Sequence, residues 1–128
     1  MKIATFNINN VNRRLPNLLR WLRAAKPDVV ALQELKSTDE DFPVSAIDKA
    51  GYGAVWRGQK TWNGVAILAR NADPVLIRNQ LRGDSDDREA RYISAASAPS
   101  AGWSGWTLSP PAHCTSNPAS KATWTFAC

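Results

Sequence analysis

The chain has 128 residues, which is the size of one small domain. Its 16 lysines and arginines outnumber its 11 acidic residues, and the resulting net charge of +5 suits an anionic partner such as nucleic acid. No apolar run approaches the ~20 residues that a membrane-spanning helix needs, and the polar N-terminus does not resemble a signal peptide, so we expect a cytoplasmic protein without membrane contacts.

The first predicted element is a strand over Lys2–Ile8. In a strand its residues alternate between two faces, with Ile3, Thr5 and Asn7 on one and Ala4, Phe6 and Ile8 on the other. A polar loop is expected to follow over Asn9–Arg14.

The second predicted element is a helix, because leucines recur at helical spacing: Leu15, Leu18, Leu19 and Leu22. Pro16 suits the first turn of such a helix, and Pro27 is expected to end it.

The apolar run Asp28–Leu35 predicts a strand that is buried on both faces. A short helix is expected over Phe42–Ala50, closed by Gly51, followed by paired strands over Gly53–Gly58 and Val65–Ala69. Together these elements, a strand, a helix, a strand and a hairpin, predict a layered α/β or α+β sheet.

The chain then becomes polar over Arg78–Glu89, where we expect a loop, and one more strand is expected to begin over Arg91–Ala95. After Ile93 the composition changes. Residues 94–128 hold one basic residue, no acidic residue and a single Leu, Ile or Val, so they lack the pattern of a folded core. We therefore divide the chain into a nuclease-like part at 1–93 and a tail at 94–128 that lies outside the native domain.

Two polar side chains stand where predicted strands end. Asn7 closes the first strand and Glu34 lies near the end of the second. Strands joined by one crossover helix can lie side by side, which would bring the two together, and a carboxylate beside an amide suits Mg²⁺. The alternative is that Glu34 is a rim carboxylate paired with Lys36 or an arginine.

Three segments resemble the exonuclease III family of the endonuclease/exonuclease/phosphatase superfamily. They are Lys2–Asn9 (KIATFNIN), Pro27–Lys36 (PDVVALQELK) and Gly58–Leu68 (GQKTWNGVAIL), and the resemblance extends over residues 1–93. It implies a four-layered α/β sandwich, of which this chain holds an incomplete part.

The resemblance also implies an activity and a set of residues. Members of the family cut DNA at abasic sites and process 3′ ends with Mg²⁺, for which Mn²⁺ is an alternative. Glu34 matches the metal-binding carboxylate, and Asn7 matches the amide that supports the metal and the scissile phosphate. Lys36, Asn63 and Arg91 fall in stretches that line the DNA-binding side.

Later motifs of that family are absent from residues 1–128: the Tyr-x-Pro-x-Gly stretch, Gly-Asp-x-Asn and Ser-Asp-His. The sole histidine, His113, has no acidic neighbour and is expected to be a loop residue without a catalytic role. We therefore expect a truncated or frameshifted sequence that is inactive, with uncovered sheet surface and unpaired edges that favour self-association.

Two other functions remain open at this stage. The basic surface of residues 1–93 would also suit a non-catalytic nucleic-acid-binding module, whose DNA binding would ignore EDTA. The chain could also act on lipid or inositol phosphates, as other enzymes of the wider superfamily do. Competition between abasic DNA and such phosphoesters would show which substrate it prefers.

Overall fold

The structure is a computed structural model, and it describes residues 1–80, 83, 86, 88–97, 104–108 and 123–126. In chain order its elements are β1 (Ile3–Asn7), α1 (Val11–Ala25), β2 (Val29–Gln33), α2 (Val44–Asp48), β3 (Tyr52–Arg57), β4 (Val65–Arg70), β5 (Val75–Arg78), β6 (Ile93–Ser97), β7 (Ser104–Leu108) and β8 (Thr123–Phe126).

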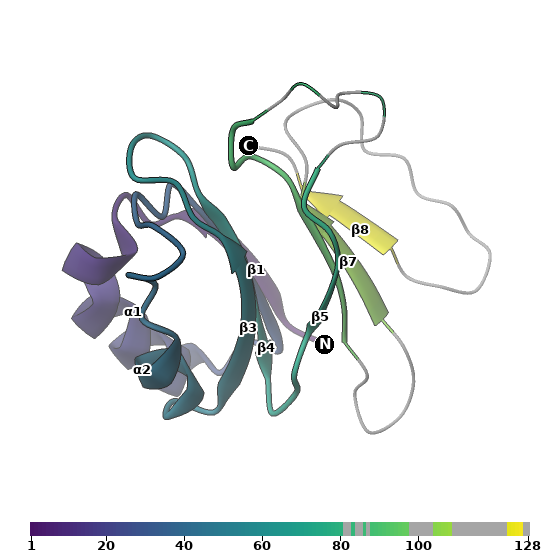
Figure 1. Cartoon of the computed structure of the whole chain (residues 1–128). Coiled ribbons are helices and arrows are strands. Elements are labelled where there is room, and N and C mark those ends of the chain that lie inside the picture. Colours follow the sequence, from purple (N-terminus) through teal and green to yellow (C-terminus); the bar gives the residue numbers. More distant parts are fainter. Residues whose placement is uncertain (81–82, 84–85, 87, 98–103, 109–122, 127–128) are drawn as a thin grey trace.

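The strands form two sheets that face each other (Figure 1). The first sheet has the order β1-β2-β4-β3, and the second has the order β5-β6-β7-β8. β1 and β2 are parallel and are joined through α1, whereas β2, β4 and β3 pair antiparallel. Both helices lie on the outer face of the first sheet, so the described residues contain three of the four layers of the expected sandwich.

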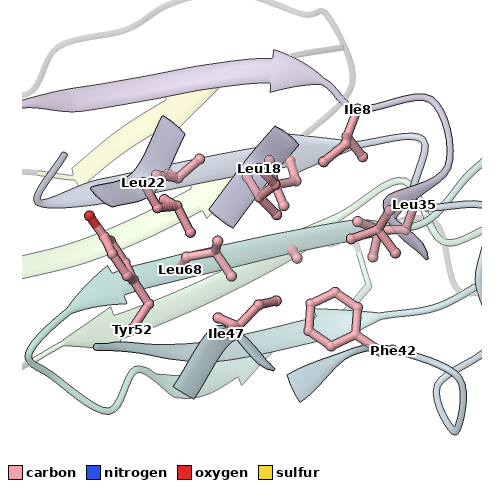
Figure 2. Packing of buried hydrophobic residues seen from close by; sticks show 12 residues of the cluster. Ile8, Leu18, Leu22, Leu35, Phe42, Ile47, Tyr52 and Leu68 are labelled. Atoms are coloured by element: carbon pink, nitrogen blue, oxygen red, sulfur yellow. The ribbon is translucent and has the colours of Figure 1, made fainter. Parts of the chain in front are cut away.

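The larger core lies between the helices and the first sheet (Figure 2). Leu18 and Leu22 of α1 and Ile47 of α2 pack there against Leu32 and Leu68 of the sheet. All five are at most 2% exposed. Because one face of α1 and one of α2 are apolar, burying both against one sheet removes a continuous apolar surface from water.

The smaller core lies between the two sheets. Val29 and Ala31 of β2 and Ile67 of β4 meet Ile93 and Ala95 of β6 there. The inner face of the first sheet is therefore covered at its centre, contrary to the expectation of an uncovered face. This explains why every residue of β2 is buried, as its apolar run predicts.

The strands predicted near residues 2–8, 28–35, 53–58 and 65–69 are confirmed. The predicted start of the helix is wrong. α1 begins at Val11 because the side chain of Asn10 accepts a hydrogen bond from the Arg13 N–H and caps the first turn. Pro16 consequently lies inside the helix and beyond its first turn.

A strand at Val75–Arg78 was not predicted, although the polar stretch after it was expected to be a loop. β6 starts at Ile93 and continues to Ser97, past the expected boundary at residue 93, and Ser94 and Ala95 are buried. His113 lies outside the described residues. Within the part of the chain that the structure describes, no helix is long and apolar enough to cross a membrane.

Candidate active site

Asn7 and Glu34 meet at one end of the first sheet. Asn7 ends β1 and is paired in register with Gln33, the last residue of β2, so Glu34 emerges beside it. The Asn7 amide Nδ2 donates a hydrogen bond to Glu34 Oε1 at 2.5 Å. The predicted proximity of these two side chains is confirmed.

The backbone holds Glu34 in an unusual conformation. Its φ is +52°, in the left-handed region, which costs an L-residue free energy and places its side chain at the sheet end. The loop after β1 holds the Glu34 backbone on one side, because the Asn10 N–H donates to the Glu34 carbonyl at 3.0 Å. The loop before β4 fixes the other, since the Leu35 N–H donates to the Gly64 carbonyl at 3.1 Å.

The Gly64 conformation makes this arrangement possible. Its φ is +100°, and a Cβ at this position would lie 2.8 Å from the Leu35 Cβ. Glycine avoids both the strained backbone and this collision, so the loop can pack directly on the residue that follows Glu34.

Lys36 contacts the other carboxylate oxygen of Glu34. Its Nζ lies 3.1 Å from Glu34 Oε2, donates a hydrogen bond to Asn9 Oδ1 at 2.7 Å, and lies 5.3 Å from the Trp62 ring centroid. The rim pairing that we considered as an alternative for Glu34 is therefore present together with its contact to Asn7.

These contacts keep Glu34 ionised. The hydrogen bond from Asn7 and then the one from Lys36 lower the pKa of the Glu34 carboxyl below its ordinary value, against a smaller opposing effect of burial. The side chain remains 37% exposed. The site therefore presents a negatively charged carboxylate that solvent and ligands can reach.

A hollow of about 230 Å³ lies against this pair. Its lining includes Asn7, Glu34, Asn63 and Arg91, so four of the five residues singled out in the sequence border one space. The Gly64 N–H donates to the Ala90 carbonyl at 3.0 Å, which ties the segment before β6 to the loop of Asn63. Lys36 stands beside the hollow through its contact with Glu34.

Trp62 is a lining residue that the sequence reasoning missed. Its side chain is 76% exposed, and its backbone φ is +64°. A lone tryptophan within a polar loop between two predicted strands was the available signal, because a large aromatic residue seldom stays in water without a partner.

The donor set fits a hard divalent cation only in part. Glu34 is the one carboxylate among the lining residues, and the described residues contain no cluster of three or more His, Cys, Asp or Glu side chains. Mg²⁺ often keeps several waters and uses one or two carboxylates together with substrate phosphate. An ionised carboxylate beside a hollow that solvent can reach meets that minimum.

The sequence matches the model of the Endonuclease/Exonuclease/phosphatase family over residues 4–99, three quarters of the chain. The chain belongs to this family. The match ends six residues after the boundary that the change in composition indicated, close to the end of β6.

Several proteins that the chain resembles are named as DNA-processing enzymes. The chain is 38% identical over 95 residues to exodeoxyribonuclease III of Haemophilus influenzae, a match that covers 74% of this chain and 35% of that protein. The structure resembles the 3′ phosphatase NExo from Neisseria bound to product DNA hairpin, with a TM-score of 0.73 and 39% identity over 83% of this chain and 40% of that one.

It also resembles an AP endonuclease from Archaeoglobus fulgidus, with a TM-score of 0.75 and 34% identity over 85% of this chain and 40% of that one. The chain thus spans about a third of the length of the curated relative and two fifths of each solved structure.

Proposed function

We propose that residues 1–93 form the N-terminal part of a DNA-repair nuclease that hydrolyses phosphodiester bonds at abasic sites and 3′ ends. The observation that carries this proposal is the Asn7–Glu34 pair at 2.5 Å beside a hollow that Asn63 and Arg91 also line. The similarity to exodeoxyribonuclease III and to an AP endonuclease supports the choice of DNA as the substrate.

Glu34 would bind the metal ion, Mg²⁺ or alternatively Mn²⁺, with the Asn7 amide beside it. A divalent ion there supplies positive charge for the phosphate oxygens of the substrate. Asn7 keeps the Glu34 carboxylate ionised and oriented, while Lys36 and Arg91 contribute cationic groups for a phosphate backbone. Asn63 contributes an amide at the wall of the same hollow.

Metal-dependent DNA binding tests these roles. We expect the 128-residue chain to bind an abasic-site duplex about tenfold more tightly in Mg²⁺ than in EDTA, because the ion replaces a carboxylate–phosphate repulsion with a bridge. Glu34→Gln should remove the difference, and Glu40→Gln, at another exposed carboxylate, should retain it. Fluorescence anisotropy measures both affinities.

The non-catalytic alternative makes a different prediction for the same titration. Binding would fall steeply with salt, would be the same in Mg²⁺ and EDTA, and would be unaffected by Glu34→Gln. That result would reject the metal site while leaving nucleic-acid binding in place.

We also propose that the chain as given is inactive or nearly so. Once Glu34 binds a metal ion, no other carboxylate among the residues that the structure describes lines the hollow to accept a proton from the attacking water. Each absent group that stabilises charge in the transition state lowers the rate by roughly 10²–10³. Gel analysis of abasic-duplex incision should therefore show no Mg²⁺-dependent product above that of Glu34→Gln.

We also propose that the C-terminal tail is not part of the native domain and results from a frameshift in the gene. The family match extends to residue 99, so we apply this proposal to the residues after it. If the tail is translated in the wrong reading frame, one of the two other frames of the gene beyond this point should encode a Gly-Asp-x-Asn motif. The absence of this motif from both frames would reject the frameshift.

Self-association is proposed at the exposed strand β5, where Val75, Leu76 and Ile77 are 62%, 43% and 59% exposed. Sedimentation at increasing concentration checks it, with Ile77→Lys expected to keep the chain monomeric.

A further inference from the structure

The excess positive charge of the chain lies in one helix and its cap. Residues 11–26 contain no acidic residue and five basic ones: Arg13, Arg14, Arg20, Arg23 and Lys26. When these five are set aside, 11 of the 16 lysines and arginines remain, which equals the number of acidic residues. The net charge of +5 is therefore carried by α1 and the residue that caps it.

Three of these arginines form a stripe on the outward face of α1. Arg13 and Arg20 are seven residues apart, which is two helical turns, and Arg23 follows three residues later on the same side. All three are exposed, whereas the buried residues of α1 lie on the face that packs on the first sheet. The helix stands on the outer side of that sheet (Figure 1), so this arginine stripe faces solvent over about 15 Å of the helix axis.

No opposite charge neutralises the stripe. Within the part of the chain that the structure describes, no acidic side chain forms an ion pair with Arg13, Arg20 or Arg23. Arg20 donates a hydrogen bond to a neutral group, Asn17 Oδ1, at 2.9 Å. A solvated helix face usually interleaves both signs of charge, so this face differs from one that serves solubility alone.

The stripe also opposes the stability of its own helix. The first turn of α1 contains no acidic residue, although the helix dipole favours negative charge there and disfavours the guanidinium of Arg13. Arg20 and Arg23 are like charges three residues apart, which repel each other. A charge arrangement that costs stability without a local gain is typical of a surface that binds a partner, and the partner of a cationic stripe is a polyanion.

The stripe begins beside the candidate active site. The Val11 N–H donates to the Leu35 carbonyl at 2.9 Å, directly after Glu34, so the first turn of α1 is tied to the end of β2. Arg13 lies in that turn, and Arg20 and Arg23 follow at increasing distance from the site. An anionic chain that is bound at the hollow can therefore continue along the helix.

The direction of the stripe distinguishes a single strand from a duplex. Double-stranded DNA is stiff over about 150 base pairs, so a duplex that lies across the end of the sheet does not turn onto the outer side of a helix. We propose that the arginine stripe binds the phosphate backbone of a single-stranded nucleic acid that extends from the candidate site. The choice of nucleic acid as the polyanion rests on the proposed function, whereas binding to the stripe requires no metal ion.

The salt dependence of single-strand binding tests the proposal. The full 128-residue chain is titrated in EDTA with a labelled oligothymidine of about 15 nucleotides, and fluorescence anisotropy gives the affinity at several salt concentrations. Arg20→Gln and Arg23→Gln should each reduce the slope of log affinity against log salt by about 0.7. The double variant should bind about tenfold more weakly, or weaker still, at low salt.

Two matched variants separate the stripe from general effects. Lys49→Gln removes one cation from an exposed position at the end of α2, and should keep the wild-type slope. Glu34→Gln should keep it as well, because no metal ion is present. Both arginine variants should unfold at or above the wild-type temperature, since they relieve repulsion within α1, so that weaker binding does not reflect loss of the fold.

The outcomes decide between partners. An unchanged slope in the double variant, or an equal decrease in Lys49→Gln, would overturn the proposal. So would an equal loss of affinity for a blunt duplex of the same length, or a loss confined to polyglutamate, because the stripe would then bind a duplex or an acidic polypeptide. A reduced slope in a chain that gains no affinity for abasic DNA from Mg²⁺ would uphold the stripe and reject the proposed metal site.

Discussion

The first sheet and β5, the edge strand of the second sheet, differ in how completely their side chains are buried. The first sheet packs on both faces, with twelve buried residues in the core beneath the helices and a second cluster toward the other sheet. The second sheet contributes Ile93 and Ala95 to that cluster, while its edge strand β5 leaves three consecutive aliphatic residues exposed. We infer that side chains of the first sheet contribute more to stability than those of β5, and that the candidate site is rigid because it stands on the first sheet.

The largest expected difference in unfolding free energy is between two leucine truncations, one in each sheet. Leu68→Ala removes a fully buried side chain of β4 and should lower the free energy of unfolding by about 2–5 kcal/mol. Leu76→Ala, at a 43% exposed position of β5, should change it by no more than about 0.5 kcal/mol. Urea denaturation measures both, and equal losses would contradict the comparison.

A glycine pair tests whether the site depends on close packing against the first sheet. Gly64→Ala should lower the free energy of unfolding by about 2–4 kcal/mol, because it combines a strained φ of +100° with a collision against Leu35. Gly83→Ala has a similar φ of +85° with no atom within 4 Å of its Cβ, and should cost about 1 kcal/mol. Similar losses for both variants would mean that contact with Leu35 does not matter.

Acid should weaken the first sheet through Asp28. The Lys2 N–H donates to this carboxylate at 2.6 Å and Arg70 pairs with it, and these bonds lower its pKa in the folded state. A carboxyl group with a lowered folded pKa stabilises the fold above its unfolded pKa and loses that contribution as the pH falls through the folded value. Stability should therefore decline below about pH 4.

Asp28→Asn is the matched variant for this pH dependence. It should be less stable than the wild type at neutral pH and should approach it in acid, so that the two curves of unfolding free energy against pH converge. Parallel curves would show that Asp28 does not contribute to the acid response.

The smallest expected effect is on metal affinity. Lys36 and a cation compete for the Glu34 carboxylate, since the ammonium lies 3.1 Å from Oε2. Exposed ion pairs contribute about 0–1 kcal/mol, so Lys36→Met should tighten Mn²⁺ binding by up to about fivefold. Isothermal titration measures this, and weaker binding in Lys36→Met would mean that the lysine supports the ion instead.

Much of the first sheet could be predicted from the sequence because its signals are local. The apolar run Asp28–Leu35 reflects the complete burial of β2, whereas the alternation at Lys2–Ile8 marks β1, whose residues are half-buried or exposed. Asn7 and Glu34 meet because the two strands are parallel neighbours. The true start of α1 was harder to predict, since it depends on a hydrogen bond from one asparagine.

The rest of the site depends on contacts that no local pattern reports. The hydrogen bond between Gly64 and Ala90 joins residues 26 positions apart, and it places Arg91 beside Asn63 around the hollow. The strand β5 was missed because its aliphatic residues are exposed, so burial did not impose an alternating pattern on them.

The most direct test of the central claim, that Asn7 and Glu34 form a metal-binding pair, is paramagnetic broadening by Mn²⁺ in the NMR spectrum of the ¹⁵N-labelled chain. We predict that sub-stoichiometric Mn²⁺ selectively broadens the Asn7 side-chain amide and the Leu35 backbone amide, and that Glu34→Gln abolishes the effect. Broadening confined to another acidic segment, such as Asp39–Asp41, with the Asn7 amide still sharp, would contradict the account.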